Sequence, residues 1–358
     1  MTGEIIYSID GLPIQQNRFF ATEKEALACP VGSFVLIQDP LTGIIHNEAF
    51  RSELMSYDEN YQNEQGYSKV FEQHLHQIIE ILKPHFTGKS ILEIGCGKGR
   101  FLKLMRGQGF SIVGIDPAYE GDDPDIVKGQ FLPSIGMTGE AIILRHVLEH
   151  IPDPLSFLAS IANANGGKGL IYIEVPCLDW ISDHRAWFDL FYEHVNYFRM
   201  SDFFRMFNKV IDSGRFFGGQ YLYLVADLAS LCRDPKRDVH GFHLPPDFFD
   251  GIDRAVTEIK SQFNRKNIIW GGASKGVIFA LQLLRRGKVT PDFVIDINPF
   301  KQGKYMPVTG LPVLSPENGI SLMDHHDAIF VMNSIYFDEI TAAAGDRFRY
   351  YKVDQNEL

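Results

Sequence analysis

The chain has 358 residues, of which 45% are hydrophobic and 22% are charged, and its formal net charge is −11. This length predicts two or three domains of roughly 100–200 residues each. The acidic balance and the lack of a basic run exclude a large nucleic-acid interface, although a single nucleotide diphosphate remains compatible. No stretch approaches the ~20 apolar residues that span a bilayer, and the first residues do not have the pattern of a signal peptide. We therefore expect a cytoplasmic protein, monomeric or homodimeric, that has neither nucleic acid nor membrane as a partner.

The four cysteines are far apart in the sequence and form no C-x-x-C pair. They are Cys29, Cys96, Cys177 and Cys232. This spacing argues against a zinc ribbon and against a disulfide framework. No metal is predicted.

Residues 1–62 are expected to form a short β-rich segment, with a strand from Ser33 to Ile37 and a turn over 39–43. Apolar residues at helical spacing then predict a helix from Tyr67 to Leu82, which Pro84 ends.

Strands and helices alternate through the next part of the chain, residues 63–260. Strands are expected at 90–94, 111–115, 141–144 and 169–175, and helices at 100–108 and 154–164. This alternation predicts an α/β fold with a doubly wound, largely parallel sheet. The aromatic-rich residues 178–210 are expected to be helical, 218–226 to be a late antiparallel strand, and 235–250 to be a loop.

A second and smaller Rossmann-like α/β unit is expected over residues 261–358. A strand at 268–270 leads into the glycine-rich run from Gly271 to Gly276 and a helix that reaches Arg286. Further apolar strands are expected at 293–296 and 328–332.

The run Glu93-Ile94-Gly95-Cys96-Gly97-Lys98-Gly99 is the most informative motif. Glycines between a strand and a helix bring backbone N–H groups next to a ligand that side chains would keep away. The G-x-G-x-G spacing differs from the G-x-G-x-x-G of dinucleotide sites. A carboxylate at Glu93 suits the positively charged amino-acid part of S-adenosylmethionine (SAM) better than a pyrophosphate. Asp116 ends the next strand, where its carboxylate can accept both ribose hydroxyl hydrogen bonds.

These features together resemble class I SAM-dependent methyltransferases, and the segment from His146 to Pro154 resembles the end of that family's fourth strand. The resemblance implies a class I methyltransferase fold, with SAM as the cofactor. It also implies that the cofactor is bound by Glu93, Gly95, Cys96, Gly97, Gly99, Asp116 and His146.

Four further stretches resemble the sugar-nucleotide C-methyltransferases. They are the segment Phe191 to Phe198 (the family's Y-x-E-H-x-x-Y-F), Gly218 to Gln220, Trp270 to Gly276, and Asp296 to Tyr305, which matches D-x-N-P-x-K-Q-G-x-Y. The resemblance covers roughly residues 70–345. It implies a nucleotide-linked deoxysugar as the small-molecule substrate, and a role in deoxysugar biosynthesis.

The chain departs from that family in two places. The family's amino-terminal zinc domain carries paired cysteines, and only Cys29 is present here, so this region is shortened. The family's tyrosine three positions before the histidine is Phe191 here, which removes a hydroxyl from the site.

The resemblance implies C-methylation through an enolate. His194 would be the base that removes a proton next to the sugar ketone, because the pKa of histidine, ~6.5, lies near working pH. Glu193 would orient or hydrogen-bond nearby groups, and His150 would stabilise the enolate oxygen or hold the substrate.

Five residues are expected to contact the substrate, namely Tyr192, Tyr197, Gly218, Gly219 and Lys275, the last of them through a phosphate. The aromatic residues between Trp180 and Tyr192 are expected to form a lid or wall that excludes water. The alternative for them is a hydrophobic face packed under the sheet.

Two other functions stay open. An O-methyltransferase acting on a sugar or related small molecule needs only a hydroxyl that the same histidine deprotonates. A nucleotide-sugar-binding or NAD-binding protein with an inactive methyltransferase fold would use the second glycine loop, Gly271 to Gly276, for which no acidic ribose ligand after the next strand is identified.

Overall fold

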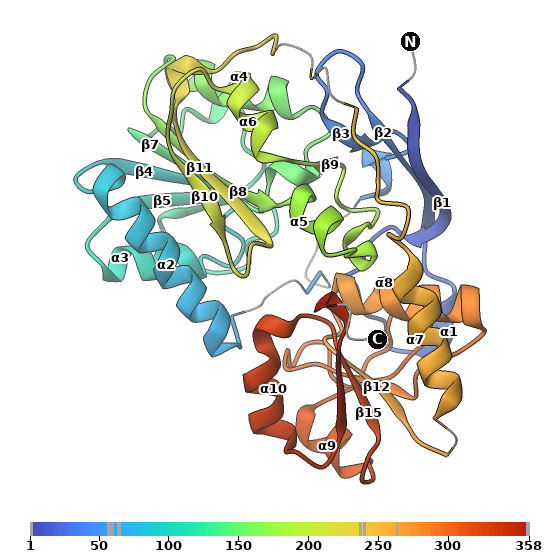
Figure 1. Ribbon diagram of the computed structural model, residues 1–358. Helices are drawn as coiled ribbons and strands as arrows, with labels where there is room; N and C mark the ends of the chain where they lie inside the picture. Colours follow the sequence, from blue (N-terminus) through green and yellow to red (C-terminus); the bar gives the residue numbers. More distant parts are fainter. Residues whose placement is uncertain are drawn as a thin grey trace.

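The computed structural model describes residues 3–55, 61–62, 66–235, 238, 241–262 and 264–355. Their strands form three sheets, of four, seven and five strands. Figure 1 shows the seven-stranded sheet and its helices above the five-stranded sheet, with the amino-terminal strands at their side. The expected architecture of two α/β units and a β-rich amino-terminal segment is confirmed.

The amino-terminal sheet is antiparallel, in the order β1-β2-β3-β9. Its strands are β1 (Ile5–Pro13), β2 (Val31–Gln38), β3 (Ile45–Asn47) and β9 (Asn196–Tyr197), accompanied by α1 (Glu23–Leu27) and the 3-10 turn η1 (Ser52–Leu54). Strand β9 comes from far along the chain and begins two residues after His194. The sheet is therefore not complete within residues 1–62, where the sequence places the first boundary.

The central sheet has the order β10-β11-β8-β7-β4-β5-β6. Its strands are β4 (Ser90–Ile94), β5 (Ser111–Asp116), β6 (Ile126–Lys128), β7 (Ala141–Arg145), β8 (Leu170–Pro176), β10 (Val210–Phe216) and β11 (Tyr221–Asp227). Strands β4 to β8 are parallel, β11 is antiparallel to β8, and β10 is antiparallel to β11. The strand order reverses beside β4, which is where doubly wound sheets bind ligands.

The helices of this central unit are α2 (Lys69–Phe86), α3 (Arg100–Gly107), α4 (Pro154–Ala164), α5 (Leu178–Asp183) and α6 (Met200–Met206). The 3-10 turns are η2 (Pro133–Ile135), η3 (Leu148–His150), η4 (Trp187–Asp189) and η5 (Leu228–Ser230). Helix α2 begins where the side chain of Ser68 accepts a hydrogen bond from the Phe71 N–H. It continues two residues beyond Pro84, its expected end, and its last residue Phe86 is fully buried in the core.

Residues 178–210 do not form the helical region that their composition predicts. Only α5 and α6 are α-helical, and between them the chain forms η4, turns and β9. Trp187 and Phe188 are buried in the hydrophobic core that the three units share. Tertiary contacts therefore bury these aromatic side chains, although the chain around them is not an α-helix. The sequence predicts no strand at the position of β10, which pairs with β11.

The carboxyl-terminal sheet is parallel, in the order β14-β13-β12-β15-β16. Its strands are β12 (Asn267–Trp270), β13 (Phe293–Ile295), β14 (Val313–Leu314), β15 (Ala328–Val331) and β16 (Arg349–Lys352). Its helices and turns are α7 (Asp250–Ser261), α8 (Ser274–Gln282), the π-helical η6 (Leu283–Gly287), α9 (Pro316–Ser321), η7 (Ser334–Tyr336), α10 (Phe337–Ala344) and η8 (Val353–Gln355). Helix α7 packs against η6, so this unit starts before residue 261, the boundary that the sequence gives.

The carboxyl ends of both parallel sheets open into one cavity. Residues that follow β4, β5 and β7 in the central sheet line it, as do residues that follow β12, β13 and β15 in the other. Parallel α/β sheets bind ligands at this edge. One cavity therefore adjoins the ligand-binding edges of two parallel sheets.

Candidate active site

The cavity has a volume of about 890 Å³ and receives residues from all three units. Asn17 and Tyr61 come from the amino-terminal region, the glycine loop and His194 from the central unit, and Lys275 from the carboxyl-terminal unit. This volume lies in the range of small-molecule sites, roughly 300–1,000 Å³.

The glycine loop after β4 brings bare backbone to the cavity. Gly95 packs so closely on Val147 that a Cβ added to it would lie 2.2 Å from a methyl group, whereas a Cβ on Gly97 would meet nothing within 4 Å. Gly97 is thus the position where a ligand can approach the main chain. Gly99 precedes α3 and does not line the cavity, and a Cβ there would lie 2.4 Å from Ile126. We therefore correct the expected cofactor contact of Gly99 to a packing role.

Asp116, at the end of β5, fixes this loop. Its Oδ2 accepts a hydrogen bond of 2.8 Å from the Gly97 N–H, and its Oδ1 accepts one of 2.7 Å from the Ala118 N–H. The residue is 9% exposed and lines the cavity. Each carboxylate oxygen can accept a further hydrogen bond, so a ribose diol fits here.

Glu93 lies under the loop and faces the cavity with an unsatisfied oxygen. It is 1% exposed, and its Oε2 has no hydrogen-bond partner among the described residues. Burial raises the pKa of this carboxyl to about 7, although the nearby Arg145 guanidinium lowers it. A cationic ligand would pair with it. Cys96 lines the cavity beside it, and burial raises the pKa of its thiol, so it offers a neutral wall.

His146 follows β7 in a left-handed conformation with φ of 50° and lines the cavity. Its ring nitrogens lie 3.2 Å from Glu149 Oε1 and 3.1 Å from Glu174 Oε1. Burial opposes protonation, but these two carboxylates outweigh it and raise the pKa of His146 to about 9. Glu174 has no exposed surface and also contacts His74 Nε2 at 3.0 Å and Arg145 Nε at 3.0 Å. Burial would raise the pKa of Glu174, but Arg145 and the histidines hold it well below its usual value.

Tyr197 closes the turn that carries His194. Its hydroxyl accepts a hydrogen bond of 3.0 Å from the Phe191 N–H and donates one of 3.1 Å to the Phe191 carbonyl. The residue is 2% exposed and does not line the cavity. The expected substrate contact of Tyr197 is thus wrong in this structure, and its role is to position the histidine.

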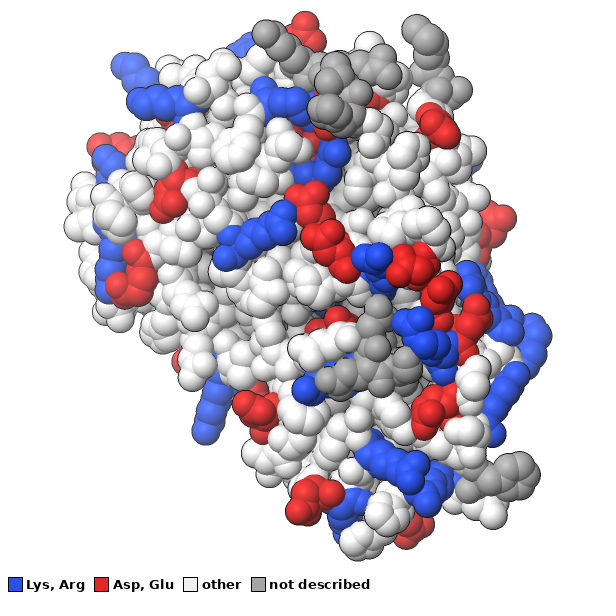
Figure 2. Space-filling model, viewed as in Figure 1, with Lys and Arg blue, Asp and Glu red and all other residues white. Residues whose placement is uncertain are grey.

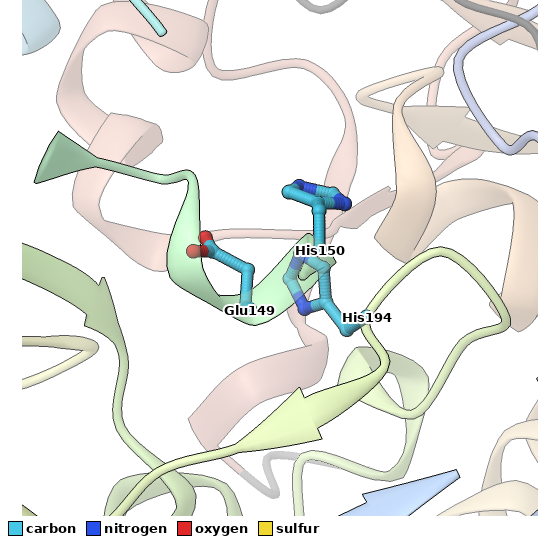
Figure 3. Close-up of side chains that lie close together, drawn as sticks. All are labelled: Glu149, His150 and His194. Atoms are coloured by element: carbon cyan, nitrogen blue, oxygen red, sulfur yellow. The ribbon is translucent and has the colours of Figure 1, made fainter. Parts of the chain in front are cut away.

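His194 enters the cavity from this turn, and His150 enters it from η3 (Figure 3). The two ring centroids are 5.0 Å apart, and the His194 ring lies 4.1 Å from that of Phe191. His150 Nδ1 lies 2.9 Å from the Glu193 carbonyl oxygen. Burial and the charges of His150 and His146 hold the pKa of His194 well below its usual value. His194 is therefore a neutral imidazole at neutral pH.

Glu149 lies close to the two histidines. One of its carboxylate oxygens and one nitrogen of each ring lie within 4.8 Å of one another. Two imidazoles and a carboxylate are donors that a divalent ion can use. The expectation from the sequence that no metal is bound stays a prediction.

Glu193 connects the histidine turn to the amino-terminal region. Its Oε1 accepts a hydrogen bond from the Gln16 N–H, and its Oε2 accepts one of 2.6 Å from the Tyr61 hydroxyl. It is 1% exposed, and burial raises its pKa although His150 and these donors oppose the shift. Gln16 and Tyr61 cannot be identified from the sequence, since no motif links them to a residue more than 130 positions away.

Three other expected substrate contacts lie outside the cavity. Tyr192 is 1% exposed, and its hydroxyl accepts a hydrogen bond of 2.9 Å from the Arg51 N–H in the amino-terminal region. Gly218 and Gly219 form the β10–β11 turn, and a Cβ on Gly219 would lie 3.1 Å from Trp180. These three assignments are corrected, because Tyr192 packs on the amino-terminal region, Gly218 on Ile335 of the carboxyl-terminal unit and Gly219 on Trp180 of the central unit.

The expected aromatic lid is also corrected. Trp180, Trp187, Phe188 and Tyr192 are buried in the shared core and do not line the cavity. The Trp187 ring stacks on Phe279 of α8 with centroids 5.8 Å apart. Of the expected lid, Phe191 lines the cavity. Hydrophobic packing, the alternative to a lid, describes the other four residues better.

Lys275 does line the cavity, at the first turn of α8. Its Nζ lies 3.0 Å from Asp189 Oδ2 and donates a 2.8 Å hydrogen bond to Gln220 Oε1. The Gln220 amide also pairs with that of Asn333. Lys275 thus joins the central and carboxyl-terminal units at the edge of the cavity.

On the face shown in Figure 2, Lys and Arg side chains of the described residues alternate with Asp and Glu, and no continuous basic surface forms. Among the helices described, none combines the length and the apolar character required to cross a bilayer.

Comparisons with known proteins agree with this geometry. Residues 67–210 match a family described as a methyltransferase domain. Residues 252–349 match a second family, described as the C-methyltransferase C-terminal domain. The C-methyltransferase NovU of Streptomyces niveus is 24% identical over 283 residues, which cover 68% of this chain and 67% of that protein. An uncharacterised methyltransferase of Alkaliphilus oremlandii is 28% identical over 138 residues, which cover 34% of this chain and 63% of that protein. The PH0226 protein of Pyrococcus horikoshii OT3 is a similar solved structure, with a TM-score of 0.38 and 13% identity, over 48% of this chain and 99% of that one.

The chain is a class I SAM-dependent methyltransferase. Its second unit is the C-terminal domain of the C-methyltransferases. The cofactor is SAM, and the site fits it: Gly97 leaves room beside the main chain, Asp116 offers acceptors for a ribose, and Glu93 holds an unpartnered oxygen towards a cation.

Replacing Asp116 with alanine is expected to raise the Kd for SAM by about tenfold or more, since hydrogen bonds from ribose hydroxyls to a carboxylate are lost. Isothermal titration calorimetry measures this effect. Asp122→Ala, an exposed position six residues further on, is the matched control and should bind SAM normally. Unchanged affinity in Asp116→Ala would contradict the ribose assignment.

Proposed function

We propose that this protein transfers the methyl group of SAM to a carbon atom of a nucleotide-linked keto-deoxysugar, and that His194 is the base. The observation that carries the proposal is the His194 imidazole. It lines the same cavity as the glycine loop, and no hydrogen bond from a described residue engages its ring. The match of residues 252–349 to the C-methyltransferase C-terminal domain and the similarity to NovU support transfer to carbon.

His194 would remove a proton from the carbon next to the sugar ketone. The electron pair of that C–H bond becomes the enolate, whose carbon forms the new bond to the methyl group. SAM supplies this electrophilic methyl group, and the electron pair of the broken bond stays on its sulfur. A neutral histidine can accept the proton because its pKa is low enough to keep it unprotonated at neutral pH.

His150 and Glu193 would prepare the site. The His150 ring lies beside that of His194 and is held by the Glu193 carbonyl, which is a suitable place to stabilise an enolate oxygen. The Glu193 carboxylate holds the Tyr61 hydroxyl at the cavity wall. Both residues would orient groups around the substrate. Such positioning provides much of the rate enhancement in reactions of this kind.

Phe191 favours a second candidate, O-methylation of a sugar or related small molecule. Its ring packs on His194 and offers no hydroxyl to a substrate carbonyl. His194 would then deprotonate a substrate hydroxyl. The cavity geometry is compatible with either acceptor atom.

The variant His194→Ala is expected to lower kcat by a factor of roughly 10²–10⁴, the usual contribution of a general base, with nearly unchanged affinity for SAM. Labelled methyl transfer to keto-sugar nucleotides, followed by mass spectrometry, measures turnover. His76→Ala replaces an exposed histidine of α2 and serves as the control. Full activity in His194→Ala would show that this residue is not the base. Loss of wild-type activity in EDTA would indicate that a bound metal ion takes part in the reaction instead.

The acid limb of the pH profile of kcat/KM is expected below pH ~6.5, the ordinary pKa of histidine. The base is active when neutral, and the lowered pKa of His194 keeps it neutral until the pH falls through that lowered value. His150→Ala removes one of the charges that lower the pKa, so the limb should move towards higher pH. A limb at or above pH 6.5 in the wild type would contradict the assignment.

Exchange of substrate hydrogen with deuterium oxide separates the two acceptor atoms. Incubation with a keto-sugar nucleotide is expected to exchange the C–H next to the ketone in the wild type and not in His194→Ala. Mass spectrometry or proton NMR records the exchange. Methyl transfer to oxygen without any exchange would favour O-methylation.

A further inference from the structure

The 3-10 turn that carries His150 depends on other segments for its position. This turn, η3, has three residues, and Val147, the residue before it, provides no side-chain cap. A single 3-10 turn has poor hydrogen-bond geometry and gains little stability from its own bonds. The place of the His150 ring in the cavity is therefore set by contacts that reach η3 from elsewhere in the chain.

The side chain of Asn196 holds both ends of η3. Its Nδ2 donates a 3.3 Å hydrogen bond to the Leu148 carbonyl and a 2.6 Å hydrogen bond to the Ile151 carbonyl. These carbonyls belong to the first residue of the turn and to the residue that follows its last. Asn196 is 3% exposed and Leu148 has no exposed surface, so bulk water cannot take the place of the amide.

Two more hydrogen bonds join the same segments, which lie side by side (Figure 3). The Val195 N–H donates to the Glu149 carbonyl at 2.8 Å, and His150 Nδ1 lies 2.9 Å from the Glu193 carbonyl oxygen. Each residue from 148 to 151 is thus bonded to the segment 193–196, in which His194 lies. These bonds set the spacing of the two imidazole rings, whose centroids are 5.0 Å apart.

Asn196 acts on this pair of rings without touching the cavity. Its main chain belongs to β9 and pairs with His46 of β3. Its side chain does not line the cavity. The bond from Val195 is made by the main chain, and the bond to Glu193 is made by an active-site imidazole. Asn196 is therefore the position of the segment where a substitution can loosen η3 while the main-chain bond and both rings are kept.

We infer that Asn196 is a positioning residue of the methyl transfer, which holds His150 at a fixed place beside His194. Loss of its two hydrogen bonds leaves two buried carbonyls without their donor, which is unfavourable, so η3 moves to satisfy them. A shift of about 1 Å in a group that contacts the substrate can lower the rate by a factor of roughly 10². This inference rests on the proposed function, because it gives Asn196 a part in the same reaction.

The test replaces Asn196 with aspartate, which keeps the size of the side chain and presents oxygen instead of N–H to the two carbonyls. The variant is expected to lower kcat for a keto-sugar nucleotide by a factor of roughly 10–100, with nearly unchanged affinity for SAM, which shows that the central unit is folded. Asn196→Ala removes the amide without adding a charge and should lower kcat similarly. Steady-state kinetics and calorimetry with SAM measure these effects.

The matched control is Asn165→Ala. The Asn165 amide also donates to two main-chain carbonyls, those of Gly139 at 2.8 Å and Lys168 at 2.5 Å, and it does not line the cavity. This variant should keep the kcat of the wild type. The inference is overturned if folded Asn196→Asp and Asn196→Ala retain wild-type kcat, or if Asn165→Ala loses as much kcat as they do.

A second readout needs no substrate. In full-length protein with isotope-labelled histidine, NMR signals of the two rings are assigned with His150→Ala and His194→Ala. Both Asn196 variants are expected to shift the signals of His150 and His194 and to leave that of His76, an exposed residue of α2, in place. An unshifted His150 signal in these variants would also overturn the inference. Shifted signals in a protein that methylates no keto sugar would support the hold of Asn196 on η3 and contradict the proposed reaction.

Discussion

Glu174 has no exposed surface, and side chains from α2, β7 and β8 surround its carboxylate. An isolated carboxylate buried here would cost several kcal/mol of desolvation. The carboxyl end of β8 is therefore stable only when His74, Arg145 and Tyr172 are in position around Glu174. Through His146 the same group holds Glu149, whose main-chain carbonyl accepts a 2.8 Å hydrogen bond from the Val195 N–H. A chain of contacts thus links the middle of the sheet to the turn of His194.

The charges of the cavity are divided between its two glycine loops. The loop after β4 has the buried carboxyl of Glu93 beneath it. The loop after β12 has two ion pairs beside it, Lys275 with Asp189 at 3.0 Å and Lys301 with Asp296 at 3.4 Å. The two glycine loops thus have similar backbone turns but different charged groups beside them. His194 lines the same cavity, which both loops reach.

The sequence predicts the parts of the site that depend on local chain geometry. The glycine spacing and the carboxylate after the next strand identify Gly97 and Asp116, because strand, turn and helix are consecutive. Tyr192 and Tyr197 belong to the motif of His194, but spacing does not tell which way a side chain points, and both turn into the core. Tyr61 could not be found at all, since its contact with Glu193 depends on the packing of separate units.

Strand β9 joins the turn of His194 to the amino-terminal sheet, where His46 and Asn196 are paired. The main chain next to His194 is therefore part of the amino-terminal sheet and of neither parallel sheet. A chimaera that took its first sixty residues from a related enzyme would keep both glycine loops unaltered. It would nevertheless have a different strand pairing beside the imidazole of His194, so the position of that side chain depends on a segment that lacks any recognisable motif.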